Sequence, residues 1–86
     1  MTKSWTYKYG EDTIVVENSW VDGEKLYVNG ELHDHNRGVK ANGSVVKGKL
    51  ASGEEVKASL GGTVTIECSL FIDNKLQTPL EIKEEK

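Results

Sequence analysis

Several features are missing from this sequence, and each absence narrows what the protein can be. The chain has a single cysteine, Cys68, which excludes a disulfide within one copy. No hydrophobic run approaches the length that spans a membrane, and the apolar core of a secretion signal does not follow Met1. We therefore expect a cytoplasmic protein with no membrane partner.

The chain also lacks a large excess of either positive or negative charge. The 11 Lys and Arg residues are mixed along the chain with 14 Asp and Glu residues, which gives a net charge of -3. Domains that bind nucleic acid carry a basic patch or stripe, so nucleic acid is not expected as a partner. Helical periodicity with capping residues is absent too, and this predicts little or no helix.

A long alternation of apolar and polar residues dominates the last third of the chain. The apolar positions are Val64, Ile66, Cys68, Leu70 and Ile72, followed by Leu76, Leu80 and Ile82. A period of two is typical of a half-buried antiparallel strand. Shorter β-branched and aromatic runs precede it at a spacing of roughly 8–12 residues. We predict one all-β domain over residues 1–86, an antiparallel β-sandwich or flattened meander barrel of about eight strands.

Turn residues and matching of faces predict the hairpins. Asn29-Gly30 predicts a two-residue turn because both residues tolerate positive φ. Residues 51–53 and 73–75 are each predicted to form a three-residue loop, since a two-residue loop would set apolar against polar side chains. The second loop would place Ile72 opposite Leu76. Pro79 cannot donate to a ladder, so the last strand is expected at an edge or with a bulge there.

Four segments, taken in order, resemble parts of a known family. They are Ile14-Val15-Val16-Glu17, Leu26-Tyr27-Val28-Asn29-Gly30-Glu31 after a glycine-containing turn, Val46-Lys47-Gly48-Lys49, and Ser69-Leu70-Phe71-Ile72-Asp73-Asn74-Lys75. This order resembles one β-domain of the Fas apoptosis inhibitory molecule family. The resemblance implies a compact antiparallel β structure without catalytic residues that takes part in protein–protein contacts. It carries over no site residue.

His33-Asp34-His35 is the one local cluster with metal-ligand chemistry. Residues two apart in a strand share a face, so both imidazoles can meet one metal ion. If the preceding hairpin turn has two residues, Glu24 lies opposite His35 and a weak zinc or nickel site is complete. A three-residue loop would put Lys25 there and remove the carboxylate. The simpler interpretation is a polar edge strand, and no cofactor is expected.

The aromatic residues are the candidates for a binding surface: Trp5, Tyr7, Trp20 and Phe71. The alternation places Phe71 on the polar side of its strand. There it either packs under the loop that holds Trp20 or belongs to an exposed patch for a peptide, a sugar or a second copy of the protein.

No catalytic constellation emerges from the sequence. Cys68 lies on the apolar face of its strand, where a thiol behaves as a small hydrophobe with a raised pKa. A Cys–His pair with His33 or His35 is the enzymatic alternative. We expect a non-enzymatic module that binds a protein partner or a second copy of itself. The alternatives are a small-ligand binder of calycin-like architecture with a cavity near Trp5 and Tyr7, and a weak metal-binding protein that uses the two histidines.

Overall fold

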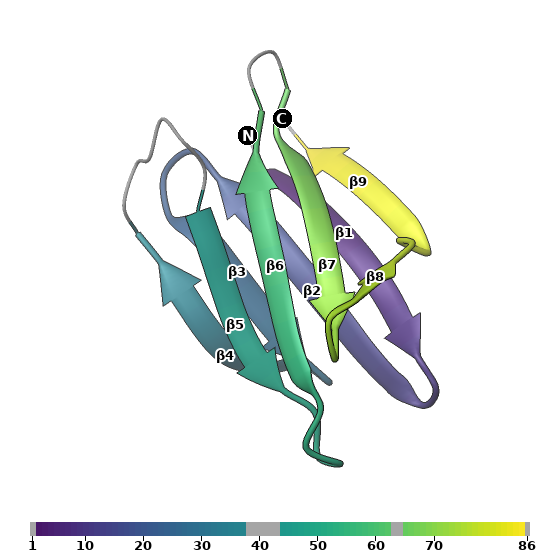
Figure 1. Ribbon diagram of the computed structural model, residues 1–86. Coiled ribbons are helices and arrows are strands. Elements are labelled where there is room, and N and C mark those ends of the chain that lie inside the picture. The colour runs from purple at the N-terminus through teal and green to yellow at the C-terminus, as the bar shows by residue number, and fades with distance from the viewer. Residues whose placement is uncertain (1, 38–43, 63–64, 86) are drawn as a thin grey trace.

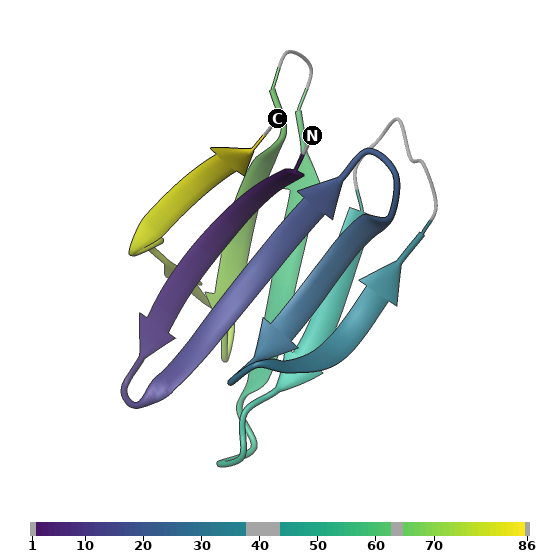
Figure 2. The same cartoon turned by 180° about the vertical axis from the view of Figure 1, so that it is seen from behind.

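The computed structural model describes residues 2–37, 44–62 and 65–85, and these form nine strands in two antiparallel sheets. The first sheet has the order β4-β3-β2-β1-β9, with β1 (Thr2–Tyr9), β2 (Asp12–Ser19), β3 (Gly23–Val28), β4 (Glu31–Asn36) and β9 (Glu81–Glu85). The second has the order β5-β6-β7-β8, with β5 (Ser44–Lys49), β6 (Glu55–Gly61), β7 (Glu67–Ile72) and β8 (Lys75–Gln77). The two sheets form two layers (Figure 1, Figure 2). The all-β class is confirmed, and no helix able to cross a membrane occurs in the described ranges.

The core lies between the two layers and follows from the alternation along each strand. The side chains that fill it are those of Trp5, Tyr7, Ile14, Val16, Leu26, Val28, Val46, Leu50, Val56, Ala58, Leu60, Leu70 and Ile72. Burial of these side chains is the main force that holds the sheets together. Val64, the first residue of the predicted alternation, lies outside the described residues.

Two of the three predicted turns have the predicted length, and the third does not. Asn29 and Gly30 form the predicted two-residue turn, both with positive φ, between Val28 and Glu31. The predicted three-residue loop at residues 51–53 is also confirmed, because Gly48 pairs with Val56 as face matching required.

The predicted three-residue loop at residues 73–75 is wrong. Asp73 and Asn74 have φ of 53° and 64° and form a two-residue turn, so Ile72 pairs with Lys75 and Phe71 with Leu76. Aspartate and asparagine tolerate this left-handed conformation better than other non-glycine residues. β8 is only three residues long, so it has little core-facing surface to oppose the turn's preference.

The segment expected to complete the last hairpin divides between the two sheets. β8 pairs with β7, whereas β9 pairs with β1 in the other sheet. Pro79 lies between the two strands, and both are edge strands, which agrees with the expectation for this proline.

Candidate functional site

β4 carries a bulge at the position of the histidines. The register runs regularly from Val28–Glu31 to Tyr27–Leu32, then shifts so that Leu26 pairs with Asp34. His33 is therefore the extra residue of the strand. Lys25, and not Glu24, lies opposite His35. The two-residue turn was predicted correctly, but the bulge removes the carboxylate from the position that a metal site would need.

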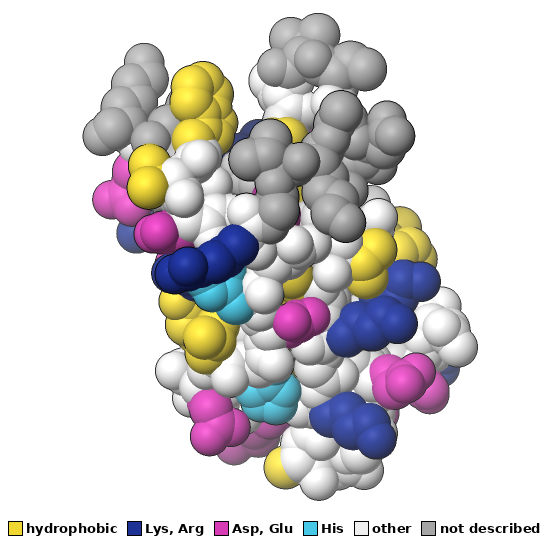
Figure 3. All heavy atoms as spheres, turned by 90° about the vertical axis from the view of Figure 1, so that its left-hand side faces the viewer, with side chains coloured by type: hydrophobic (Ala, Val, Ile, Leu, Met, Phe, Trp, Pro, Cys, Tyr) yellow, Lys and Arg dark blue, Asp and Glu magenta, His cyan; other side chains and the backbone are white. Residues whose placement is uncertain are grey.

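The two imidazoles are held by different neighbours. His33 Nδ1 accepts a hydrogen bond from the Lys49 backbone N–H at 3.3 Å, while His35 Nε2 lies 2.6 Å from the Asp22 carbonyl oxygen and donates to it. On the face of the molecule that carries both histidines, the two rings lie apart (Figure 3). No group of three or more His, Cys, Asp or Glu side chains suited to a metal ion occurs in the described part of the chain.

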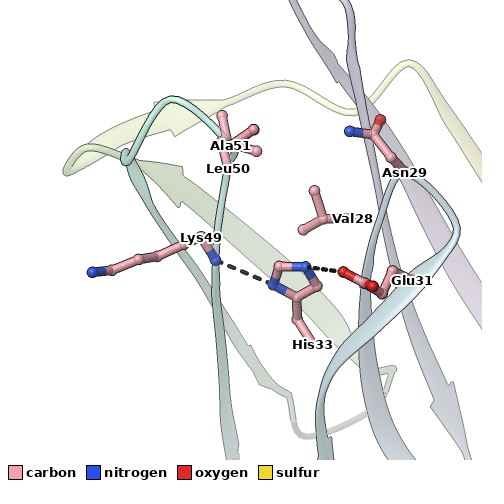
Figure 4. Close-up of a pocket in the computed structure, with 7 residues that line it drawn as sticks. All are labelled: Val28, Asn29, Glu31, His33, Lys49, Leu50 and Ala51. Atoms are coloured by element: carbon pink, nitrogen blue, oxygen red, sulfur yellow. Dashed lines mark hydrogen bonds and ion pairs between the residues drawn. The ribbon is translucent and has the colours of Figure 1, made fainter.

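An open pocket of about 470 Å³ lies beside His33. Its lining consists of Val28, Asn29, Glu31, His33, Lys49, Leu50 and Ala51 (Figure 4). His33 Nε2 lies 3.4 Å from Glu31 Oε1, and the His33 side chain is 22% exposed. The Lys49 ammonium group points away from the pocket (Figure 4). The pocket therefore offers one imidazole and one carboxylate to a small ligand.

The Asp34 carboxylate joins the edges of the two sheets. Oδ1 accepts from the backbone N–H of His35 in β4 at 2.9 Å, and Oδ2 accepts from the backbone N–H of Lys47 in β5 at 2.8 Å. The bulge turns this side chain toward β5. Together with the bond from Lys49 N–H to His33, these contacts occupy edge donors that another strand would otherwise use.

The predicted binding aromatics are dispersed. Trp5 and Tyr7 are 2% and 1% exposed and belong to the core, so neither side chain is available at a surface. Phe71 lies half-buried on the outer face of the second sheet, between Lys57 and Leu76. Trp20 lies at the β2–β3 turn, at the opposite end of the molecule from the β7–β8 turn (Figure 1, Figure 2). The structure does not bring Phe71 and Trp20 together.

Trp20 nevertheless projects from an ordered turn. Its side chain is 75% exposed, and that of the neighbouring Val21 is also exposed. Ser19 Oγ accepts hydrogen bonds from the backbone N–H groups of Val21 and Asp22, both at 3.2 Å. The contact from His35 to the Asp22 carbonyl oxygen fixes the same turn from β4. Trp20 is thus presented to solvent by a hydrogen-bonded loop.

A second exposed apolar surface lies on β9 and just before it, and sequence reasoning missed it. Leu80 and Ile82 are 71% and 53% exposed. Ile82 pairs with Trp5, so its side chain is on the core-facing side of the sheet. β9 is the edge strand of the first sheet, and no described strand pairs with its outer side. The sequence signal was Pro79, which marks the point where the last strand leaves one sheet for the other.

Cys68 is partly buried against the core, and its Sγ contacts a polar side chain. The Tyr7 hydroxyl donates to Cys68 Sγ at 3.5 Å. Burial raises the pKa of the Cys68 thiol, and the hydrogen bond from Tyr7 offsets part of this increase. Burial also raises the pKa of the Tyr7 hydroxyl. A thiol that stays neutral is a poor nucleophile.

These shifts predict a loss of stability at alkaline pH. The folded protein holds the Cys68 proton to higher pH than the unfolded chain does. The free energy of unfolding should therefore fall as pH rises above about 8.5, by up to about 1.4 kcal/mol per pH unit. Urea unfolding from neutral to alkaline pH should show a smaller slope for Cys68→Ala than for the wild type. Equal slopes would show that Cys68 does not titrate differently in the folded state.

Comparison with protein-family models found no match, and neither the curated proteins nor the solved structures gave one. The similarity to the Fas apoptosis inhibitory molecule family therefore stays a prediction.

Proposed function

We propose that the protein is a non-enzymatic, cytoplasmic interaction module that binds an extended segment of a protein partner at the free edge of β9. The observation that carries this proposal is the combination of an unpaired strand edge with two exposed apolar side chains, Leu80 and Ile82. Strand addition uses the same two elements: backbone hydrogen bonds give affinity and alternate side chains give specificity.

The other strand edges support this choice by contrast. Asp34 and His33 occupy backbone donors of β5, and Asp34 occupies one of β4 as well. β8 offers only three residues. β9 has five residues, and in the described part of the chain no side-chain hydrogen bond covers its outer backbone groups. Lys83 and the preceding Pro79 restrict pairing at a strand edge, so a partner must match the charges of β9; its accessible backbone and apolar neighbours favour a binding role.

The non-enzymatic assignment rests on the candidate nucleophile and bases. Cys68 Sγ accepts a hydrogen bond from the Tyr7 hydroxyl, while His33 Nδ1 accepts one from the Lys49 backbone N–H. Nucleophilic catalysis needs the nucleophile and its base within hydrogen-bond reach of each other. A Cys–His pair is not formed by these contacts.

Selection of extended peptides on the immobilised protein tests the proposal. We expect selected peptides to shift the amide NMR signals of β9 and of its neighbour β1. The variant Glu84→Pro should lose this binding, because it removes a backbone donor on the outer side of β9 and leaves Leu80 and Ile82 in place. The core variant Cys68→Ala serves as a control that should bind normally. Peptides whose shifts map to another surface, or binding unaffected by Glu84→Pro, would refute the proposal.

A small-ligand or weak metal site beside His33 is the second candidate. The pocket volume of about 470 Å³ is in the range of small-molecule sites. This pocket lies beside β4 and β5, not near Trp5 and Tyr7, where the sequence placed a cavity. Zinc added to the free protein should shift the signals of His33 and Glu31 if the site binds metal. Unchanged signals would remove the metal-binding alternative.

A further inference from the structure

We infer that the partner strand of β9 is β9 of a second copy of this chain, paired antiparallel about a two-fold axis through Ile82. This inference rests on the proposed function and specifies its partner. The charges and apolar side chains of β9 are complementary to themselves in one register only. A two-fold axis of this kind produces a self-complementary interface, in which each contact occurs twice.

The direction of the backbone groups decides which residues can form hydrogen bonds across the axis. The Thr6 carbonyl oxygen accepts from Leu80 N–H at 2.7 Å, so the Thr6 backbone groups point toward β9. Thr6 is opposite Glu81, whose backbone groups therefore point back toward β1. Because this direction alternates along a strand, Ile82 and Glu84 present their N–H and C=O groups to the free side.

The charge pattern separates the possible registers. An axis through residue 81 places Glu81 opposite its own copy, and an axis through residue 83 does the same for Lys83 and pairs Glu81 with Glu85. An axis through residue 84 places Glu84 opposite its own copy. Only the axis through Ile82 pairs Glu81 with Lys83 of the second copy, twice by symmetry, without any like-charge pair. Opposite charges directly across a strand pair stabilise it, and like charges destabilise it.

The same register brings the exposed Ile82 side chains of the two copies together. Ile82 lies opposite Ile82 of the second copy, with Cα atoms about 5.5 Å apart in a hydrogen-bonded pair. Leu80 precedes β9, and its backbone N–H points toward β1, so it lies beside the paired segment and not within it. The Ile82 side chain is exposed in the single chain and becomes covered in the pair. The first sheets of the two copies join into one continuous sheet.

Charge reversal provides the first test, read by sedimentation at increasing protein concentration. The wild type should self-associate. Either single variant, Glu81→Lys or Lys83→Glu, sets like charges opposite each other twice and should weaken association about tenfold. The double variant restores opposite charges in the reverse order and should recover the wild-type affinity. Lys57→Glu, an exposed lysine on the outer face of the second sheet, is the matched control and should associate as the wild type does.

Disulfide trapping tests the register itself. In a Cys68→Ala background, Ile82→Cys should form a cross-linked dimer on mild oxidation, because the expected Cα separation is within disulfide range. Glu84→Cys should cross-link poorly, because residue 84 lies opposite residue 80 in this register. Efficient trapping through residue 84 in place of residue 82 would overturn the axis at Ile82.

The outcomes separate this inference from the proposed function. A wild type that stays monomeric at every concentration, while selected peptides still bind β9, overturns self-pairing and leaves the peptide-binding role intact. If the protein self-associates and neither Glu81→Lys nor Lys83→Glu weakens that association, the β9 interface is overturned. Monomeric behaviour together with no peptide binding at β9 overturns both. Recovery of association in the double variant supports both.

Discussion

Replacing Gly23 by alanine is expected to lower the free energy of unfolding by about 3 kcal/mol or more. Gly23 follows the turn that holds Trp20 and has φ of +83°. A Cβ atom there would overlap the Asn36 carbonyl oxygen and lie 2.9 Å from Arg37 Cα. Both are backbone atoms of β4 and the residue after it, so they cannot move aside as a side chain could. The substitution must therefore push β3 and β4 apart.

Gly30→Ala is a matched control for this prediction. Gly30 has φ of +82°, nearly the same as Gly23, but a Cβ atom added there meets nothing within 4 Å. Its cost is the left-handed conformation alone, about 1–2 kcal/mol. Urea unfolding of the two variants separates conformational strain from the steric overlap. Equal losses would show that β4 can relax around Gly23, and would contradict the close approach of the two strands.

The fold class was predictable because it depends on local signals. The alternation of apolar and polar residues predicts which face of each strand is buried. Matching of the apolar faces predicts the length of the loop at residues 51–53. The same rule failed at residues 73–75, where the conformational preference of Asp73 and Asn74 outweighed it. A three-residue strand at an edge buries too little for its faces to decide the register. Turn chemistry was the stronger local signal there.

The arrangement of the histidines was not predictable, because its cause is distant in the sequence. The bulge at His33 gives Asp34 and His33 access to donors of β5, and β5 belongs to the other sheet. Alternation along one strand carries no information about such a contact. The core positions of Trp5 and Tyr7 had a local signal, since they alternate with polar residues, but the sequence did not show whether the buried face held a ligand or a solid core.

The sheet edges on the two sides of the molecule differ in whether side chains cover their backbone groups. On one side of the molecule, side chains of β4 cover backbone donors of β5, and Ser44 Oγ donates to Glu24 Oε1 at 2.6 Å. On the other side, β9 keeps its outer backbone groups and two apolar side chains accessible. Removing the cover from β5 should therefore cost stability and create a second open edge. Asp34 is the residue at which this can be tested.

Asp34→Ala is expected to lower the free energy of unfolding by about 2 kcal/mol. It removes the acceptor of two backbone donors, and hydrogen bonds to a charged group contribute about 1.5–3 kcal/mol each when water does not replace them. Because Asp34 is only partly buried, some of that loss is recovered by water. Asp34→Asn keeps one acceptor oxygen and should lose about half as much. Urea unfolding measures these differences.

The control for Asp34→Ala is Asp22→Ala, which removes the same charge from the same side of the molecule. Asp22 Oδ2 lies 4.0 Å from Lys25 Nζ, and its side chain is 55% exposed, so its loss should change stability by less than about 0.5 kcal/mol. Hydrogen exchange adds a local readout: the amides of His35 and Lys47 should exchange faster in Asp34→Ala and not in Asp22→Ala. Equal stability and unchanged exchange in the two variants would mean that Asp34 does not hold the sheet edges together. Faster exchange at both amides would show that one carboxylate closes this side of the sandwich.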